Sequence, residues 1–277
     1  MSNGHDHPGG RVTPTENDVA VLRHRVLQLI ANAGSGHPGS SLSCLHILQV
    51  LYRQVLRGIR EQDEERDRFI LSKGHAAPAL YACLEEQGLF PESSDRRLRE
   101  PDSILQGHPD RSRTPGIEAS SGSLGQGLSQ AVGLALGLGL RRNPAHVYVL
   151  LGDGELQEGQ VWEAAAAASH YDLANITAIV DRNGYQHDGP TESVMTLEPL
   201  AERWRAFGWH VQEIDGHDAT SIQAAVLCRP SRPSVVIAHT HKGHGVPFME
   251  GDSPWHSVKD VEQLRQYVQR MGIEGKN

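Results

Sequence analysis

The sequence predicts an α/β fold class: a doubly wound, mostly parallel sheet with helices on both faces. Residues 147–151 (VYVLL) form a continuous apolar run, which is typical of a strand buried on both faces of a parallel sheet. A helical stretch at 159–170 follows, and a second apolar run at 176–180 comes after it. Such alternation of strand and helix is typical of a doubly wound layer fold. The pattern continues with a strand at 210–214, a helix at 220–228, a strand at 235–239 and a helix at 261–271.

The amino-terminal part is predicted to be mainly helical. Apolar residues recur at helical spacing through residues 22–33, and the pattern stops at Gly34. Further helices are predicted over 42–56 and 78–86, with a short apolar run at 69–71 between them.

The segment from Leu124 to Gly139 is rich in small residues and is also predicted to be a helix. Each glycine disfavours a helix by about 1 kcal/mol relative to alanine. We therefore expect a neighbouring element to approach this helix closely, which only small residues allow.

Composition and charge limit the possible function classes. The chain has 277 residues, 38% of them apolar, and no internal repeat or long linker, so we expect residues 16–277 to form a single domain. Its formal charge of -8 argues against a nucleic-acid or anionic-membrane partner, and no apolar run is long enough to span a bilayer. Residues 1–15 are expected to be a disordered leader without a signal peptide, and Cys44, Cys83 and Cys228 fit reduced thiols. These features predict a cytoplasmic protein.

The strongest chemical signal lies where the strand at 147–151 ends, in Gly152-Asp153-Gly154. Ligands of a doubly wound sheet bind beyond the carboxyl ends of its strands, and two glycines let the backbone approach a phosphate closely. Asp153 would repel an anion, so a divalent cation is expected to bridge the two; Mg²⁺ favours one or two protein oxygens plus phosphate oxygens. Asn183, at the end of the next strand, could offer its amide oxygen to the same ion.

This pattern closely resembles the metal–diphosphate motif of thiamine-diphosphate enzymes. The resemblance implies that Asp153 and Asn183 bind the metal through their side chains and Tyr185 through its backbone carbonyl. It implies thiamine diphosphate as the cofactor and Mg²⁺ as the metal, with Ca²⁺ or Mn²⁺ as substitutes. The alternative is a plain connection between strand and helix, with an unrelated asparagine nearby.

Several of the sixteen histidines lie in turns beside glycine or proline, where function concentrates. Histidine suits proton transfer in both directions near neutral pH. Five ordered segments, which extend the likeness over almost the whole chain from about residue 15, resemble segments of the transketolase family: 35–39 (SGHPG), 72–75 (SKGH), 106–109 (QGHP), 122–127 (GSLGQG) and 254–256 (PWH).

The resemblance to transketolases also implies roles for individual residues. His37, His108 and His256 would line the site near the donor hydroxyls and the reacting carbon, although each could instead be a turn histidine satisfied by backbone. Arg99 matches a family arginine, and Lys242 matches a lysine of uncertain purpose near the active site. The residues expected to contact the cofactor are His75, Gly122, Ser123, Leu124, Gly152, Asp153, Gly154, Glu158, Asn183, Lys242 and His256.

Three further residues or segments are interpreted separately. Glu158 would pair across subunits near the interface between cofactor sites, or complement a helix dipole, or do both. Segment 215–218 (DGHD) is interpreted as a structural turn. His244 and Ser257 differ from the residues usual in the family, a basic residue and a glycine, and either could reflect an altered donor or acceptor.

The implied function is that of the amino-terminal, diphosphate-binding subunit of a split two-chain transketolase. Such an enzyme transfers a two-carbon ketol unit from a ketose, expected to be phosphorylated, to an aldehyde acceptor. The partner chain would carry the pyrimidine-binding domain, giving an α2β2 heterotetramer that acts on small sugars. The alternatives are transfer to an unusual acceptor in specialised metabolism, the α subunit of a 2-oxoacid dehydrogenase, a deoxyxylulose-phosphate-synthase-like enzyme, and a non-catalytic binding subunit.

Overall fold

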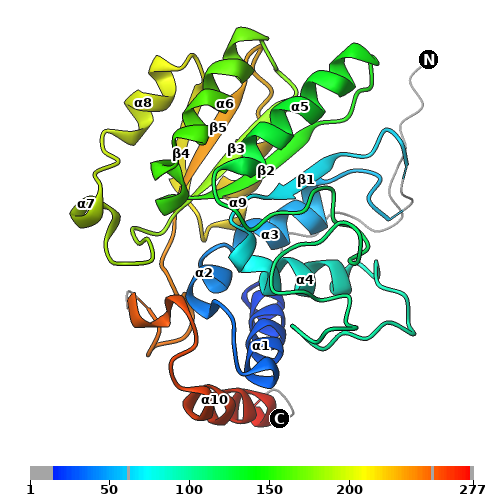
Figure 1. The fold of residues 1–277 in the computed structure, drawn as a ribbon, viewed down its shortest axis with the longest axis vertical. Coiled ribbons are helices and arrows are strands. Elements are labelled where there is room, and N and C mark those ends of the chain that lie inside the picture. Colours follow the sequence, from blue (N-terminus) through cyan, green and yellow to red (C-terminus); the bar gives the residue numbers. More distant parts are fainter. Residues whose placement is uncertain (1–14, 61–62, 251–252, 275–277) are drawn as a thin grey trace.

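The computed structural model describes residues 15–60, 63–250 and 253–274. Five strands form one sheet in the order β1-β2-β3-β5-β4, and every neighbouring pair is parallel (Figure 1). The predicted α/β fold class is therefore confirmed. The strands are β1 (Arg68–Leu71), β2 (Val147–Gly152), β3 (Ile176–Arg182), β4 (His210–Asp215) and β5 (Ser234–His239).

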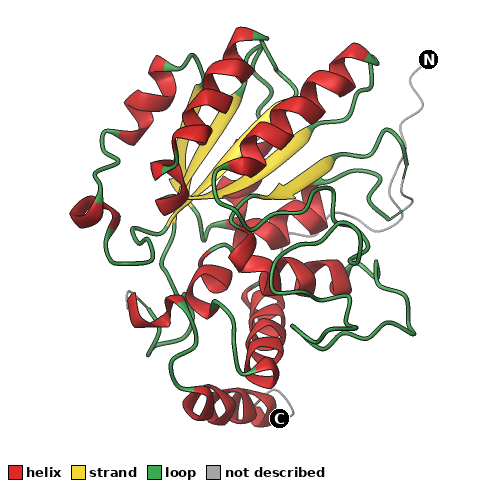
Figure 2. Ribbon diagram, in the orientation of Figure 1, coloured by secondary structure: helices red, strands yellow, loops and turns green. Residues whose placement is uncertain are grey.

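Helices cover both faces of the sheet (Figure 2). One core contains residues of α1 (Glu16–Ala33), α3 (Leu45–Val50), α4 (Ala77–Glu86) and α9 (Ala219–Leu227). The other contains residues of α5 (Gln126–Leu140), α6 (Gly159–His170) and α8 (Leu200–Ala206). Alternate side chains of β2 separate the two: Tyr148 and Leu150 belong to the first core, whereas Val149 and Leu151 belong to the second. All of β2 is buried, which explains why its sequence is apolar throughout.

The start of α1 is set by a capping box. The Thr15 side chain accepts a hydrogen bond from the Asp18 amide, and the Asp18 carboxylate accepts one from the Thr15 amide at 2.8 Å. The helix ends at Gly34, whose φ of 63° is left-handed. Thr15, which the predicted leader includes, is thus the N-cap of α1, while residues 1–14 lie outside the described residues.

The single helix predicted over residues 42–56 is wrong in two respects. The segment begins earlier, as α2 (Pro38–Ser43), because proline is well suited to the first turn of a helix. It then breaks at Cys44 before α3, and it ends in a π-helical turn, η1 (Leu51–Val55). The break gives α2 and α3 separate directions, so their polar side chains reach two different places at the sheet edge.

The predicted close approach to the glycine-rich helix α5 is right only near its start. A Cβ on Gly127 would lie 2.3 Å from the Ser72 hydroxyl, so no larger residue fits there. A Cβ on Gly133, Gly137 or Gly139 would meet nothing within 4 Å. The rest of α5 therefore has an open face in the described chain.

The remaining elements are η2 (Gly74–Ala76), η3 (Gly154–Gln157), α7 (Thr191–Val194), η4 (Ser253–His256) and α10 (Val261–Glu274). The sequence does not predict α7 or α8, because α7 buries only Thr191 and α8 only Leu200 and Trp204. No helix in the described ranges is long and apolar enough to cross a membrane.

Candidate active site at the carboxyl ends of the strands

A cavity of about 350 Å³ lies beyond the carboxyl ends of β2 and β3. Parallel strands place their carboxyl ends at one edge, so the segments that follow them converge there. Eleven of the predicted site residues line it: His37, His75, Gly122, Leu124, Gly152, Asp153, Gly154, Glu158, Asn183, Tyr185 and His256.

Asp153 follows β2 and is 1% exposed. Its Oδ1 accepts a hydrogen bond from the Gly154 amide at 2.8 Å, and its Oδ2 accepts from the Gly184 amide at 2.6 Å and from Arg182 at 3.1 Å. Burial and the nearby charge of Asp181 nevertheless raise the pKa of Asp153 to about 6. A cation at the cavity wall would stabilise the charged form of Asp153 and so lower this pKa.

Asn183 lies beside Asp153 at the end of β3 and is 8% exposed. Its amide nitrogen faces the Asp181 carboxylate at 3.2 Å, which turns Oδ1 toward the Tyr185 amide at 3.1 Å. An amide oxygen has two lone pairs, so Oδ1 keeps one for another partner. Together with the Asp153 carboxylate it forms an all-oxygen set that fits a hard divalent cation.

Sequence reasoning missed the buried ion pair that supports this wall, Lys73 with Asp181. Lys73 is 1% exposed and Asp181 is fully buried. Burial opposes both charges, but the pair outweighs it: Asp181 raises the pKa of Lys73, and Lys73 holds the pKa of Asp181 below its usual value. Ser43 donates to Asp181 at 2.6 Å, and Thr240 also donates to it. The pair thus joins α2, the ends of β1 and β3, and the segment after β5.

Glu155 is a second buried carboxylate that sequence reasoning missed. It accepts hydrogen bonds from the Gly125 amide at 2.9 Å, the Gly152 amide at 3.0 Å and the Ser72 hydroxyl. Burial raises its pKa, while these donors act in the opposite direction. Glu155 therefore fixes the loop before α5 against the ends of β1 and β2. Only its position two residues after Asp153 could have suggested this.

Four imidazoles gather in the cavity wall. The ring centroids of His37 and His75 are 5.3 Å apart, those of His37 and His256 5.2 Å, and those of His187 and His256 4.9 Å. Burial is the main cause that lowers the pKa of His37 to about 4 and that of His256 to about 3, so both are neutral at pH 7. His187 was not predicted, although it lies in a turn like the others.

Lys242 reaches the site through His256. Its Nζ lies 3.4 Å from His256 Nδ1 and 5.4 Å from the centre of the Tyr185 ring. Lys242 is 1% exposed, which places its charge beside the imidazole rather than in water.

Besides Lys242, three residues predicted from the sequence lie outside the cavity wall. His108 is exposed and packs against Gly122, where a Cβ would lie 3.2 Å from its ring. Ser123 is exposed, and Arg99 donates to the Ser35 hydroxyl at 3.3 Å. Glu158 does line the cavity, but it is exposed at the rim.

His244 lies apart from the cavity, in a cluster with His46 and His217. Its departure from the family pattern is therefore poorly explained by an altered donor or acceptor. Asp218 in segment 215–218 has the structural role that the sequence predicts, because it caps α9 by accepting from the Ser221 amide at 2.9 Å.

The fold and the cavity at its strand ends define the general class of the protein: a doubly wound α/β protein whose candidate site lies where this class binds its ligands. Residues 15–277 match the family described as transketolase, thiamine diphosphate binding domain. The chain belongs to the transketolase family, as its motifs predict, and it is a transketolase-type subunit.

Two similar relatives are short subunits. The chain is 42% identical over 254 residues to the 6-deoxy-6-sulfo-D-fructose transketolase subunit SqwG of Clostridium sp. (strain MSTE9), which covers 90% of this chain and 92% of that protein. It is also 42% identical over 255 residues to an apulose-4-phosphate transketolase subunit of Phocaeicola vulgatus, with 90% of each covered.

Longer transketolases match over part of their length. Human transketolase is 41% identical over 239 residues, which are 85% of this chain and 38% of that protein. A crystal structure of a Pichia stipitis transketolase variant superposes with a TM-score of 0.79 at 31% identity, covering 90% of this chain and 40% of that one. Transketolase from Leishmania mexicana gives a TM-score of 0.77 at 27% identity, covering 96% and 46%. The chain thus spans less than half of these solved transketolases.

Proposed function

We propose that this chain binds thiamine diphosphate through Mg²⁺ and, together with a partner chain, transfers a two-carbon ketol unit from a ketose, expected to be phosphorylated, to an aldehyde. The observation that carries the proposal is the meeting, in one cavity, of the oxygen pair of Asp153 and Asn183 with the imidazoles of His37, His75 and His256. We place this activity in the cytoplasm.

The metal would be held by the side chains of Asp153 and Asn183 and by the Tyr185 carbonyl, with Ca²⁺ or Mn²⁺ as substitutes for Mg²⁺. Gly152 and Gly154 line the cavity beside Asp153 and have no side chain of their own, so a diphosphate can approach their backbone. A Cβ on Gly154 would lie 2.5 Å from that of Gln186, so packing also requires glycine there. When bound, the cofactor would supply the electron sink that makes the breaking and forming of a carbon–carbon bond possible. His75, Gly122, Leu124 and Glu158 are the remaining cavity residues assigned to cofactor contacts.

The histidines are suited to hold and move protons of sugar hydroxyls. Lys242 Nζ can only donate, so the Nδ1 of His256 that faces it accepts, and the proton of neutral His256 is on Nε2. His37 Nδ1 is buried without a hydrogen-bond partner, which a donor hydroxyl would satisfy. His108, beside the Gly122 loop, would bind the donor sugar from the cavity entrance.

A partner chain carrying the pyrimidine-binding domain completes the proposal. The exposed rim with Ser123 and Glu158, and the open face of α5 at Gly133, are the surfaces available for it. The match to less than half of full-length transketolases supports a second chain, and we propose an α2β2 heterotetramer.

A second candidate is transfer with a modified sugar in specialised metabolism. It is favoured by the names of the two short relatives, which refer to a sulfonated fructose and to apulose 4-phosphate. The same residues would serve, since neither the metal pair nor the imidazoles select a particular substituent on the sugar.

The test is reconstitution. The purified chain, given Mg²⁺, thiamine diphosphate, a ketose phosphate and an aldose, should be silent alone. Activity should appear when the product of a neighbouring reading frame that encodes the pyrimidine-binding domain is added. A parallel screen of unphosphorylated, sulfonated and branched ketoses separates the two candidates. Robust ketol transfer by the lone chain would contradict the need for a partner.

A further inference from the structure

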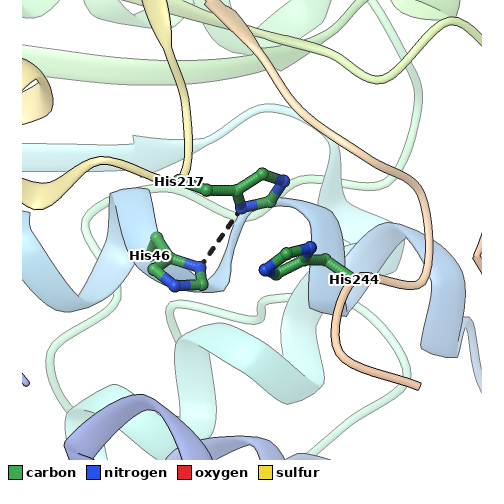
Figure 3. Close-up of side chains that lie close together, drawn as sticks. All are labelled: His46, His217 and His244. Carbon is green, nitrogen blue, oxygen red and sulfur yellow. Dashed lines mark hydrogen bonds between the residues drawn. The ribbon is translucent and has the colours of Figure 1, made fainter. Parts of the chain in front are cut away.

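Three histidines outside the cavity meet from distant segments of the chain (Figure 3). His46 is on α3, His217 follows β4, and His244 lies in the segment after β5. They converge because β4 and β5 are neighbouring parallel strands whose carboxyl ends meet at one edge, next to α3. One nitrogen from each ring lies within 4.8 Å of the others, and Nδ1 of His46 is 3.3 Å from Nδ1 of His217.

A polar cavity of about 200 Å³ adjoins this cluster and is lined by His46, His217, Gln49, Glu16 and Thr220, among others. Gln49 is 1% exposed, yet neither atom of its side-chain amide has a hydrogen-bond partner. His46 is 3% exposed, and its Nε2 also lacks one. Buried polar atoms without partners are rare in folded proteins, and in a polar cavity they indicate a missing ligand or water.

We propose that His46, His217 and His244 form a binding site for a first-row transition-metal dication of the Zn²⁺ class. Three imidazoles with an open fourth position are a known ligand set for zinc, whereas Mg²⁺ prefers oxygen. Tetrahedral bonds near 2.0 Å require about 3.4 Å between ligand nitrogens, so His46 and His217 already have the required spacing. His244 must move closer and also turn, because its ring is stacked on that of His217 with 3.7 Å between the ring centroids. The fourth ligand would be a water in the cavity, within reach of the Gln49 amide.

The surroundings supply outer partners for two of the ligands. Glu16 Oε1 lies 3.7 Å from Nε2 of His46, and Glu250 Oε1 lies 3.7 Å from Nδ1 of His244. Ligating histidines commonly donate their other N–H to a carboxylate. If these two 3.7 Å approaches shorten to hydrogen bonds, Nδ1 of His46 and Nε2 of His244 are left for the metal. Arg23 is the nearby cation that opposes a metal, and Asp215 adds a further negative charge.

The third ligand links the site to the neighbouring loop. Nε2 of His217 accepts a hydrogen bond from the His241 amide at 2.9 Å. A metal on Nδ1 requires the proton to be on Nε2, so the His241 amide must turn away. This amide directly precedes Lys242, whose ammonium contacts His256 in the first cavity. Metal binding therefore requires a small movement of the loop that carries Lys242.

The test uses the full-length chain stripped of metal with a chelator, in excess Mg²⁺ and without thiamine diphosphate, so that the Asp153 pair is not available. His5 and His7 are changed to alanine in every protein, because this leader pair could bind metal by itself. The probes are Zn²⁺ by calorimetry and Co²⁺ by visible absorption. We expect one ion per chain and the intense absorption of four-coordinate Co²⁺.

His244→Lys is the main variant, because it introduces the residue type common in the family at a half-buried position. It should lower Zn²⁺ affinity by more than the roughly 10–100-fold that loss of an outer-shell partner costs. Glu250→Gln should lower it by about tenfold. His170→Ala, at an exposed histidine of α6, should bind as the parent does. Equal affinity in the parent and His244→Lys, or no binding to the parent, would overturn the proposal. Thermal melts check that each variant is folded.

Discussion

Buried polar side chains lie at both ends of the sheet, but only those at the amino ends have all their hydrogen-bond partners within the described chain. At the amino ends, His146 Nε2 is 2.8 Å from the Thr177 hydroxyl, which is 3.0 Å from that of Ser234, across β2, β3 and β5. Asp67, also buried there, accepts from the Arg57 side chain at 2.8 Å and from the His146 amide at 2.9 Å. The chain itself supplies every one of these partners.

At the carboxyl ends, buried polar atoms face cavities instead. His37 Nδ1, His46 Nε2 and both atoms of the Gln49 amide have no hydrogen-bond partner. The pKa of Asp153 is raised, because burial and the charge of Asp181 disfavour its charged form. Burial and residue type are therefore similar at the two ends of the sheet. The ends differ in whether the chain itself supplies the hydrogen-bond partners of the buried side chains or leaves polar atoms for a ligand or water.

The largest effect on stability should come from breaking the ion pair of Lys73 and Asp181. This pair lies at the carboxyl ends of the strands, but there the chain itself supplies the partner of each charge. Asp181→Asn leaves the Lys73 charge buried with weaker partners, which costs about 3–5 kcal/mol of the free energy of unfolding. Denaturant titration with the cofactor absent measures this loss. The double variant Lys73→Met with Asp181→Leu should recover part of it, because two apolar side chains need no partner, whereas Ser43 and Thr240 lose the carboxylate to which they donate.

The matched control for that prediction is Asp95→Ala, which removes an exposed pair with Arg97 and should leave the unfolding midpoint unchanged. If Asp181→Asn cost no more than this control, the pair would belong with ordinary surface contacts.

The second prediction concerns the carboxylate of Asp153, which lines the cavity. Asp153→Asn keeps an oxygen toward the Gly184 amide but removes the charge that would bind the metal. Loss of a charged interaction of about 3 kcal/mol corresponds to more than about a hundredfold weaker binding of thiamine diphosphate in Mg²⁺. Calorimetry on the reconstituted pair measures it. Asp188→Asn, at an exposed position of the same loop, is the control and should bind normally. Unchanged affinity in Asp153→Asn would remove this residue from the site.

Much of the fold is predictable because its strands are buried on both faces. The run 147–151 and the helix at 159–170 agree with β2 and α6 almost to the residue. The break at Cys44 is not predictable, because the whole segment from Pro38 to Leu51 is buried and therefore shows no helical periodicity to interrupt. The open face of α5 cannot be predicted for another reason. A glycine indicates a close neighbour, but the sequence does not show whether that neighbour belongs to the same chain or to another.

Part of the candidate site can be predicted from a short motif. Asp153 and Asn183 each follow a strand that the sequence predicts, and both line the same cavity. Lys73, Asp181 and Glu155 were missed because their role depends on contacts across 83 to 108 residues of sequence. The cluster of His46, His217 and His244 was missed for the same reason, since no local spacing connects three separate segments.

The last prediction tests whether His146, at the amino ends of the strands, is as inaccessible to water and protons as its burial indicates. Burial lowers the pKa of His146 to about 3, whereas an unfolded histidine titrates near 6.5. Between these values only the unfolded chain binds the proton, so the free energy of unfolding falls as the pH falls from about 6.5 to 3, by up to about 1.4 kcal/mol per pH unit from this group. His146→Gln removes that contribution, so its loss of stability between pH 7 and pH 5 should be shallower than that of the parent. His37 and His256 have lowered pKa values too and remain in the variant, which leaves part of the slope. The exposed control His170→Gln should keep the parent slope, and a His146→Gln slope equal to it would mean that water or a proton reaches the amino end.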